Sequence, residues 1–236
     1  MWKIIDTGKR SAKQNMAIDA KLLKELSPNG SPILHFYDWD GECATYGHFL
    51  RPSLLLDLGR ARARDLHIAK RPTGGGIIFH VCDLAFSALV PAGSAFYCAN
   101  TLENYSYING IVKEAVKIFV QPSRHLSLLS EDSHSLDGHC DNFCMAKPTK
   151  YDVVLNGKKI AGAAQRRKRQ GYLHQGSIAI ALPKESFLDD LLLPGTKVKE
   201  AMFQNTLSVL DANWHPSDLR EMRIAIKRQL KKEFSQ

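Results

Sequence analysis

The chain has 236 residues, a formal net charge of +8 and 44% hydrophobic residues. This length suits one large domain with a core and a ligand pocket, and the composition excludes fibrous, disordered and small disulfide-rich classes. No apolar run approaches the roughly 20 residues of a membrane-spanning helix, and the first residues do not resemble a signal peptide. The positive charge favours an anionic partner but does not choose among nucleic acids, phosphorylated ligands and acidic proteins.

Hydrophobic periodicity predicts the following elements in chain order: a helix over 12–26, strands over 33–39 and 43–46, a helix over 61–65, a strand over 68–70, a helix over 102–119, a hairpin over 151–160, a strand over 176–182 and a helix over 218–232. Residues 121–142 show no apolar period and are predicted to form a functional or mobile loop. Strands separated by helices indicate an α+β fold. We expect a single domain over 1–236, with a short helical tail over about 216–236.

The 5 cysteines form an odd, irregularly spaced set, which argues against a secreted disulfide framework. We therefore expect reduced thiols and a cytoplasmic protein. His134, His139, Cys140 and Cys144 lie close together in the sequence. They lack the two separated ligand pairs of zinc fingers and ribbons, so we predict no metal site.

A glycine-rich loop, Arg71-Pro-Thr-Gly-Gly-Gly76, follows the predicted strand over 68–70. Three successive glycines let the backbone turn sharply and approach a ligand. Their N–H groups can form an anion-binding concavity beside the Arg71 guanidinium. The loop lacks the spacing of a P-loop or of a dinucleotide-binding fingerprint, and a flexible turn is an equally good interpretation. The apolar run Ile77-Ile78-Phe79 is predicted to leave the loop as a strand.

The dipeptide Asn156-Gly157 predicts a type I′ hairpin turn. Such a turn sets Val154 opposite Lys159, which makes Asp152 and Lys159 diagonal neighbours on one face of the hairpin. A cation beside a carboxylate could polarise a carbonyl group or neutralise a phosphate. From these residues alone, an ordinary surface ion pair is the better interpretation.

Three further segments have both a functional and a structural interpretation. Cys144 is surrounded in the sequence by lysines that could activate a thiol, but buried free cysteines are usually inert. The basic cluster 166–169 is predicted to be a solvated loop, since the aromatic residues of a nucleic-acid-binding module are missing. His174 enters the next strand and either lines a pocket or belongs to the core.

Taken in order, these segments resemble the lipoate–protein ligase and octanoyltransferase family, whose catalytic domain is shared with biotin–protein ligases. The resemblance spans about residues 4–182 and is carried by Ile5-Asp-Thr-Gly8, Asn15-Met-Ala-Ile-Asp19, Phe36-Tyr-x-Trp39, Tyr46-Gly-His-Phe49, the segment 71–80, Tyr151-Asp-Val-Val154, Lys158-Lys-Ile-Ala-Gly-Ala-Ala-Gln165 and His174-Gln-Gly-Ser177. It implies mixed, largely antiparallel sheets flanked by helices, and an enzyme that attaches a lipoyl or octanoyl group to a lysine of another protein.

The resemblance also implies roles for particular residues. Lys159 matches the catalytic lysine that contacts the acyl carbonyl, and Cys144 matches a catalytic cysteine. The residues implied to bind the acyl group or an acyl-adenylate are Arg71, Gly74, Gly75, Gly76, Ile77, Ile78, Phe79, His80, Asp152, Ala161, Gly162, Ala163 and His174. The family usually has an aspartate after the histidine, whereas Val81 stands here, which weakens the inference for that corner of the site.

Two mechanisms are open within this family. The run Cys144-Met-Ala-Lys-Pro-Thr-Lys-Tyr-Asp152 matches the segment of transferases that move octanoate from acyl-carrier protein through a cysteine thioester. The unbroken Gly74-Gly75-Gly76 is instead the form found in ligases, which use ATP and Mg²⁺ to make lipoyl-adenylate. We predict the transferase, with the ligase as the alternative; biotin ligation and a non-catalytic binding protein are more distant alternatives.

The implied acceptors are lipoyl domains of 2-oxoacid dehydrogenase E2 subunits or the glycine-cleavage H protein. Acyl-carrier protein would be the donor if the chain is a transferase. We expect no permanent cofactor and neither a nucleic acid nor a membrane as partner.

Overall fold

The larger of two sheets organises the protein. The computed structural model describes residues 1–210 and 212–236, and this sheet has the strand order β1-β2-β6-β10-β9-β8-β7. Its strands are β1 (Lys3–Arg10), β2 (Ile33–Trp39), β6 (Asp83–Pro91), β7 (Leu126–Leu128), β8 (Val153–Leu155), β9 (Lys158–Lys168) and β10 (Gly171–Ala179). Only the β1–β2 pair is parallel among the described strands of this sheet. The predicted mixed, largely antiparallel architecture is therefore confirmed.

A smaller sheet positions the glycine-rich loop. It consists of β4 (His67–Lys70), β3 (Cys43–Tyr46) and β5 (Ile78–His80), in the order β4-β3-β5. The loop 71–76 joins the two outer strands, so it must cross over the end of β3. There it meets Gly47, where an added Cβ would lie only 2.7 Å from the carbonyl carbon of Gly74. Glycine at position 47 is what allows this crossing.

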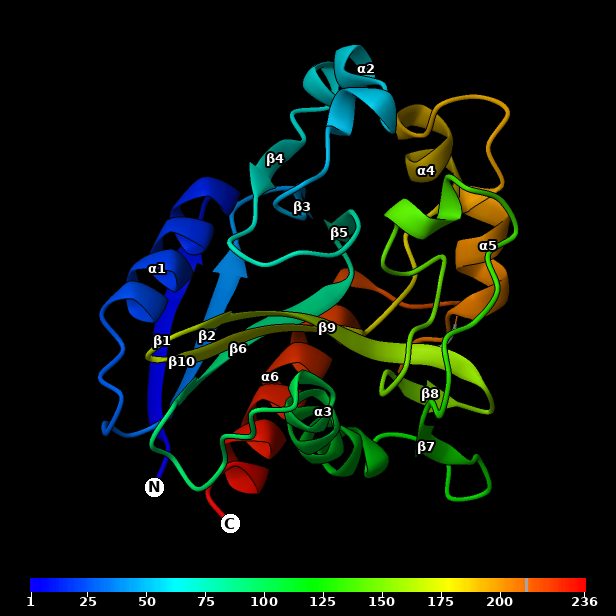
Figure 1. The fold of residues 1–236 in the computed structure, drawn as a ribbon. Helices are drawn as coiled ribbons and strands as arrows, with labels where there is room; N and C mark the ends of the chain where they lie inside the picture. The colour runs from blue at the N-terminus through cyan, green and yellow to red at the C-terminus, as the bar shows by residue number, and fades with distance from the viewer. Residues whose placement is uncertain (211) are drawn as a thin grey trace.

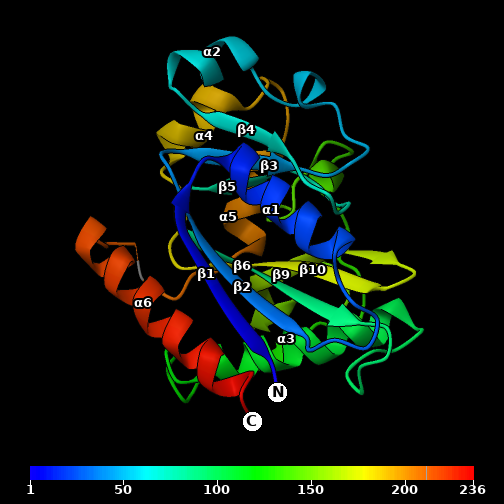
Figure 2. The ribbon, with the colours of Figure 1, turned by 90° about the vertical axis from the view of Figure 1, so that its left-hand side faces the viewer.

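Helices cover both faces of the larger sheet. On one face lie α3 (Thr101–Lys117) and α6 (Pro216–Glu233), and on the other lie α1 (Ala12–Lys24) and the smaller sheet (Figures 1 and 2). Ser11 and Gln14 form a capping box that starts α1. The remaining helices are α2 (Leu58–Ala63), α4 (Glu185–Leu191), α5 (Val198–Asn205) and the 3-10 turns η1 (Pro52–Leu54) and η2 (Cys140–Asn142). No helix in the described parts of the chain is long and apolar enough to cross a membrane.

Alternation along the central strands divides the larger sheet into an apolar face and a mixed face. Phe36, Phe86 and Tyr172 point toward α3 and α6 and belong to the main hydrophobic core. Tyr37 and Gln175 point to the other face, toward α1 and the smaller sheet. Polar side chains on that second face are buried between two layers, which is where the candidate site forms.

Several predicted elements are confirmed and others were missed. The predicted helices coincide with α1, α2, α3 and α6 to within a few residues. The cluster 166–169 was predicted as a loop, yet its first three residues belong to β9, since they pair with β10. The strands β1, β6 and β7 and the helices α4 and α5 were not predicted, and β7 and η2 lie within the segment 121–142 that was predicted as a loop. The C-terminal helix is part of the main core, because Ile226 and Leu230 are fully buried there.

Candidate active site

The glycine-rich loop is held from inside by Arg71, whose side chain is almost completely buried. Its Nη1 donates to the carbonyl oxygen of Thr45 at 3.1 Å and to the hydroxyl of Thr45 at 2.9 Å. Its Nη2 donates to the carbonyl oxygens of Gly74 at 2.9 Å and Gly76 at 2.7 Å. A buried cation requires such acceptors. The loop is thus a fixed structure rather than a flexible turn, and most of the Arg71 donors are already occupied within it.

Glycine at position 76 lets a distant segment dock onto the loop. A Cβ at Gly76 would lie 2.6 Å from the carbonyl group of Asn142. Without it, the Ile77 N–H donates to the Asn142 carbonyl at 2.6 Å, and the Cys144 N–H donates to the Ile77 carbonyl at 2.9 Å. These two bonds attach the cysteine-bearing segment to the glycine loop.

Cys144 is thereby placed beside the buried arginine. Its Sγ lies 3.9 Å from Nη2 of Arg71, and the thiol is half-buried. A Cβ added to the exposed Gly75 would lie 3.8 Å from the same sulfur. A negative charge that develops on Cys144 would therefore face a cation across a short, partly open gap.

The hairpin brings Lys159 to the same place. Asn156 and Gly157 adopt positive φ angles of 52° and 79°, as the predicted type I′ turn requires, and Val154 pairs with Lys159. Nζ of Lys159 lies 2.7 Å from Oδ2 of Asp152 and donates to the Cys144 carbonyl at 2.8 Å. The pair is buried, contrary to the surface interpretation of these two residues.

Asp152 is held in turn by Thr149, whose N–H donates to the carboxylate at 2.7 Å. Burial raises the pKa of Asp152, and the attraction of Lys159 opposes this rise without cancelling it. Position 162 must be glycine for the pair to form, because a Cβ there would lie 2.6 Å from Nζ of Lys159. The small residues after Lys159 thus make room for a buried ion pair.

A second group of buried polar residues forms the opposite wall. Thr45 accepts or donates a bond at 2.8 Å to Nε2 of His80, and Nδ1 of His80 lies 2.7 Å from Asp83. Ser177 donates to the same carboxylate at 2.7 Å. Burial alone would raise the pKa of Asp83, but His80, Ser177 and Arg223 together lower it.

Asp83 was missed because it stands three positions after the histidine instead of directly after it. The short turn between β5 and β6 returns it to His80. A carboxylate near a histidine in sequence, just after a strand, was the only available signal.

A third buried network was also missed. Gln175 accepts a bond from Thr73 at 2.7 Å and donates to Asp19 at 2.6 Å. Asp19 also accepts a bond from Ser87 at 2.7 Å and lies 2.8 Å from Nδ1 of His35. This network ties the glycine loop to α1, β10, β6 and β2, which fixes the frame around the site.

A narrow cavity connects these parts. It extends over β9, β10, β6 and β2, which are consecutive strands of the sheet. Its volume is only about 40 Å³, so side chains that line it must move before an acyl chain can enter. The predicted site residues that line it are Arg71, Ile78, His80, Cys144, Lys159, Gly162 and Ala163. The flexible side chains of Met16 and Met145 line it as well.

The other predicted site residues lie outside this lining. Asp152 acts through Lys159, and Gly74, Gly75 and Gly76 form the loop beside the cavity. Ile77 and Phe79 pack into an apolar cluster with Phe187. Ala161 belongs to the main core beneath the sheet.

His174 requires a correction. It lies in the middle of β10 and does not enter the strand from a loop. Its ring points to the opposite face, where it stacks on Phe86 and lies 2.8 Å from the Gln165 side chain. Burial lowers the pKa of His174 to about 3. Gln175 and Ser177, its neighbours on the other face, are the ones that line the cavity.

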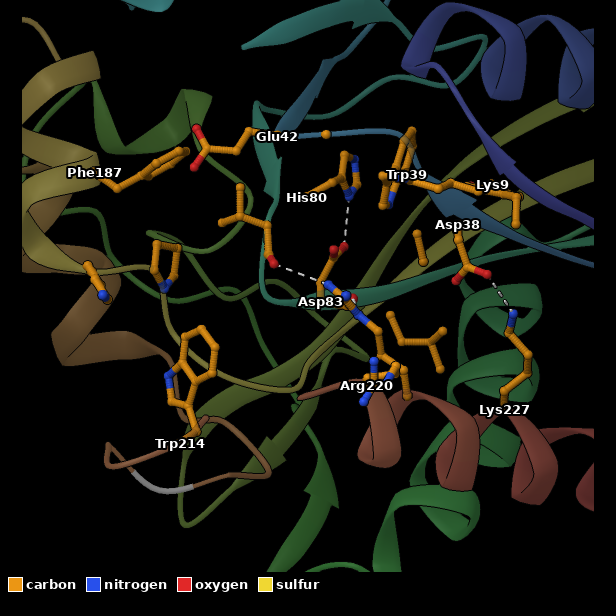
Figure 3. Close-up of a pocket in the computed structure, with 18 of the residues that line it drawn as sticks. Lys9, Asp38, Trp39, Glu42, His80, Asp83, Phe187, Trp214, Arg220 and Lys227 are labelled. Carbon is orange, nitrogen blue, oxygen red and sulfur yellow. Dashed lines mark hydrogen bonds and ion pairs between the residues drawn. The ribbon is translucent and has the colours of Figure 1, made fainter. Parts of the chain in front are cut away.

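A wider cleft of about 640 Å³ lies behind the cavity, separated from it by Tyr37, His80 and Ala85, which line both spaces. Figure 3 shows the Asp83 carboxylate directed toward His80 on this side, and Lys227 directed toward Asp38. The wider cleft contains neither Cys144 nor Lys159. The narrow cavity is therefore the candidate active site. In the described residues, no three metal-binding side chains come together.

Comparison with known proteins agrees with this geometry. Residues 11–207 match the family described as the lipoyl protein ligase A/B catalytic domain. The chain belongs to this family. The resemblance and the fold predicted from the sequence are thus confirmed, and the protein is placed among enzymes of acyl transfer or ligation.

Individual members of the lipoyl protein ligase A/B family are moderately similar. Octanoyltransferase LipM of Bacillus subtilis (strain 168) is 29% identical over 206 residues, which cover 86% of this chain and 74% of LipM. The crystal structure of lipoate-protein ligase A bound with ATP superposes with a TM-score of 0.73 at 19% identity, over 100% of this chain and 86% of that one. A bipartite lipoate protein ligase from Thermoplasma acidophilum, described with its E2 lipoyl domain, gives 0.71 at 18% identity, over 99% and 83%.

Proposed function

We propose that this enzyme moves an octanoyl group from acyl-carrier protein to a lysine of a lipoyl domain, with Cys144 carrying the acyl group as a thioester. One observation supports this most strongly: the sulfur of Cys144 and the buried ammonium of Lys159 line one narrow cavity. The greater similarity to an octanoyltransferase than to the ligase structures also supports transfer.

In the first step, the Cys144 thiolate attacks the carbonyl carbon of the donor thioester. The carbonyl oxygen becomes negative in the tetrahedral intermediate, and the Lys159 ammonium in the same cavity stabilises it. The intermediate collapses with loss of the carrier thiolate, which takes up a proton. Arg71 faces the cysteine sulfur before the attack. The octanoyl chain would lie over β10, β6 and β2, and the flexible side chains of Met16 and Met145 would move to widen the cavity of about 40 Å³ around it.

In the second step, the neutral amine of the acceptor lysine attacks the Cys144 thioester. The same oxyanion forms, the attacking nitrogen loses a proton, and the intermediate collapses to the amide as Cys144 leaves as the thiolate, which takes up that proton. Asp152 and Thr149 keep Lys159 in place through both steps.

The proposed acceptors are lipoyl domains of 2-oxoacid dehydrogenase E2 subunits or the glycine-cleavage H protein. The structurally similar Thermoplasma ligase, described together with its E2 lipoyl domain, supports the first of these. We also propose a cytoplasmic location, supported by five free thiols.

An ATP-dependent lipoate–protein ligase is the second candidate. The observation in its favour is the unbroken Gly74-Gly75-Gly76, in which the exposed Gly75 carries no side chain between solvent and the neighbouring Arg71 and Cys144, so an adenylate could approach its backbone. In that reaction ATP would be a substrate accompanied by Mg²⁺, and Lys159 would contact the acyl phosphate.

Intact-mass spectrometry distinguishes the two. After incubation with octanoyl-acyl-carrier protein and no ATP, we expect a hydroxylamine-sensitive octanoyl adduct that Cys144→Ser abolishes. Cys98→Ser, which changes another partly exposed cysteine, should retain the adduct. Lipoylation that needs ATP and free lipoate, and that survives Cys144→Ser, would instead establish the ligase.

A further inference from the structure

Three cations without an ion-pair partner among the described residues gather beside the open side of the active site. They are Lys70, Arg166 and Lys168. Arg166 donates to the Pro72 carbonyl at 2.7 Å, so it is attached to the glycine-rich loop. Lys70 ends β4 immediately before that loop. These charges therefore lie close to the loop and are not scattered over the surface.

The geometry of β9 directs two of these cations toward the opening of the cavity. Side chains two positions apart in a strand share a face, so Arg166 and Lys168 lie on the face of Ala164, which lines the cavity. A Cβ at the exposed Gly75 would lie 3.5 Å from Ala164. The line from Ala164 outward along β9 thus leads from the opening past Gly75 to positively charged side chains.

The loop after β3 completes this region. His48 donates its N–H to the Thr73 carbonyl at 3.0 Å. Repulsion by Lys70, with smaller contributions from Arg166 and Lys168, lowers the pKa of His48. Its neighbour Phe49 has 89% of its surface exposed, so an aromatic side chain is available to a partner next to these charges.

We propose that this basic rim, consisting of Lys70, Arg166, Lys168 and the exposed Phe49, docks the acceptor domain through acidic side chains that flank its target lysine. This inference rests on the proposed function, because it names the recognition surface of that acceptor. It applies equally to the transferase and to the ligase, since both must receive a protein lysine at the same opening.

A protein partner fits the rim better than a small anion does. A small anion needs convergent, desolvated donors, whereas Lys70 and Lys168 are exposed and belong to strands of two different sheets, β4 and β9. Exposed charges of one sign, with an aromatic contact among them, are typical of a surface that steers and orients a complementary protein. Carboxylates on the acceptor would also offset the repulsion between its lysine and the rim.

Binding and chemistry can be tested separately. Cys144→Ser, which cannot form a thioester, is titrated with an E2 lipoyl domain. We expect Lys70→Glu/Lys168→Glu to weaken this binding about tenfold or more. High salt should weaken the binding of the lipoyl domain to the protein with the wild-type rim to a similar extent. Lys232→Glu in α6 is an exposed control without a described ion pair and should leave binding unchanged. Replacing acidic side chains of the lipoyl domain by lysine should restore binding to the double variant.

The chemical readout separates docking from catalysis. With Cys144 intact and acylated, hydroxylamine should discharge the double variant at the wild-type rate, while the lipoyl domain should discharge it at least tenfold more slowly. Equal binding of wild-type and double variant would overturn the proposal. The proposal would also be overturned if hydroxylamine and the lipoyl domain both discharged the double variant equally slowly. The rim would then affect the reactivity of the thioester and not the docking of the acceptor. If no acyl-enzyme forms, the proposed thioester route fails, whereas the binding titration still decides the role of the rim.

Discussion

Arg71 and Cys144 lie in contact although 72 residues separate them: Nη2 of the arginine is 3.9 Å from the cysteine sulfur and 2.7 Å from the Gly76 carbonyl. The same guanidinium group therefore shapes the glycine-rich loop and faces the candidate nucleophile. A substitution that moves the loop will also move the Arg71 guanidinium relative to the Cys144 sulfur. We therefore expect small substitutions in the loop to change the reactivity of Cys144.

Replacement of Lys159 should separate stability from catalysis. In Lys159→Met we expect transfer to fall about 100- to 1000-fold, because the oxyanion loses its cation. The free energy of unfolding should fall by about 3–5 kcal/mol, because Asp152 is left buried and unpaired. In the double variant Lys159→Met/Asp152→Asn, urea titrations should show that most of the lost free energy of unfolding returns. The rate of acyl transfer should stay as low as in Lys159→Met. Recovery of both would contradict a catalytic role for Lys159.

Gly162→Ala should damage the site from within. The new Cβ would meet Nζ of Lys159 at 2.6 Å, so the ammonium must move away from the Cys144 carbonyl. We expect a large loss in the rate constant for acyl transfer in single-turnover assays.

Gly110→Ala in α3 is the matched control for Gly162→Ala, because its added Cβ meets nothing within 4 Å. It should leave transfer unchanged and stabilise the protein by about 0.5–1 kcal/mol, since alanine favours the helix. Loss of transfer in both variants would show that the effect at position 162 is not local.

His174 should affect acid stability and leave catalysis unchanged. Its pKa is about 3 in the folded protein, compared with about 6.5 when unfolded. The unfolded chain therefore binds a proton first as the pH falls. The free energy of unfolding should decline from about pH 6.5 toward pH 3, by up to about 1.4 kcal/mol per pH unit. His174→Gln should flatten this decline in urea titrations and retain transfer. A transfer defect at full stability would restore a role in acyl binding.

Asp137 links the cysteine-bearing segment to α5. Its carboxylate accepts bonds from the N–H groups of Lys197 at 2.7 Å and of His139 and Cys140 at 2.9 Å. These bonds, that of Lys197 foremost, lower the pKa of Asp137 to about 2. Because the pKa is depressed, the stabilisation is present above about pH 4 and is lost as the pH falls toward 2.

The test is Asp137→Asn, compared with wild-type at pH 7 and at pH 2. At pH 7 the variant should be less stable, by no more than about 1 kcal/mol after solvent screening, and Cys144 should react faster with iodoacetamide. At pH 2 the two proteins should have similar stability. A difference that persists at pH 2 would mean that the charge of Asp137 is not the cause.

The hairpin that carries Lys159 could be predicted from the sequence, but the burial of its ion pair could not. Two residues, Asn156 and Gly157, determine the turn, and alternation then places Lys159 beside Asp152, as the structure shows. Burial of the pair could not be predicted, because it depends on Gly162 and on the segment around Cys144, which come from other parts of the fold.

The errors also have physical causes. His174 and Gln175 differ by one position, and one position decides the face of a strand; the pairing register was not available from the sequence. The strand β6 is buried on both faces, so it lacks alternation. The strand β1 carries charged residues on an exposed edge, which obscured its pattern.

Lys159 bonds to the main-chain oxygen of Cys144 and not to its sulfur. Every amino acid supplies that oxygen, so position 144 can exchange its side chain while Lys159 keeps its acceptor. The same fold can therefore support transfer through a cysteine thioester or direct transfer from an acyl-adenylate. The side chain at position 144 alone would distinguish the two. This separation offers a structural basis for the presence of both reaction types in one protein family.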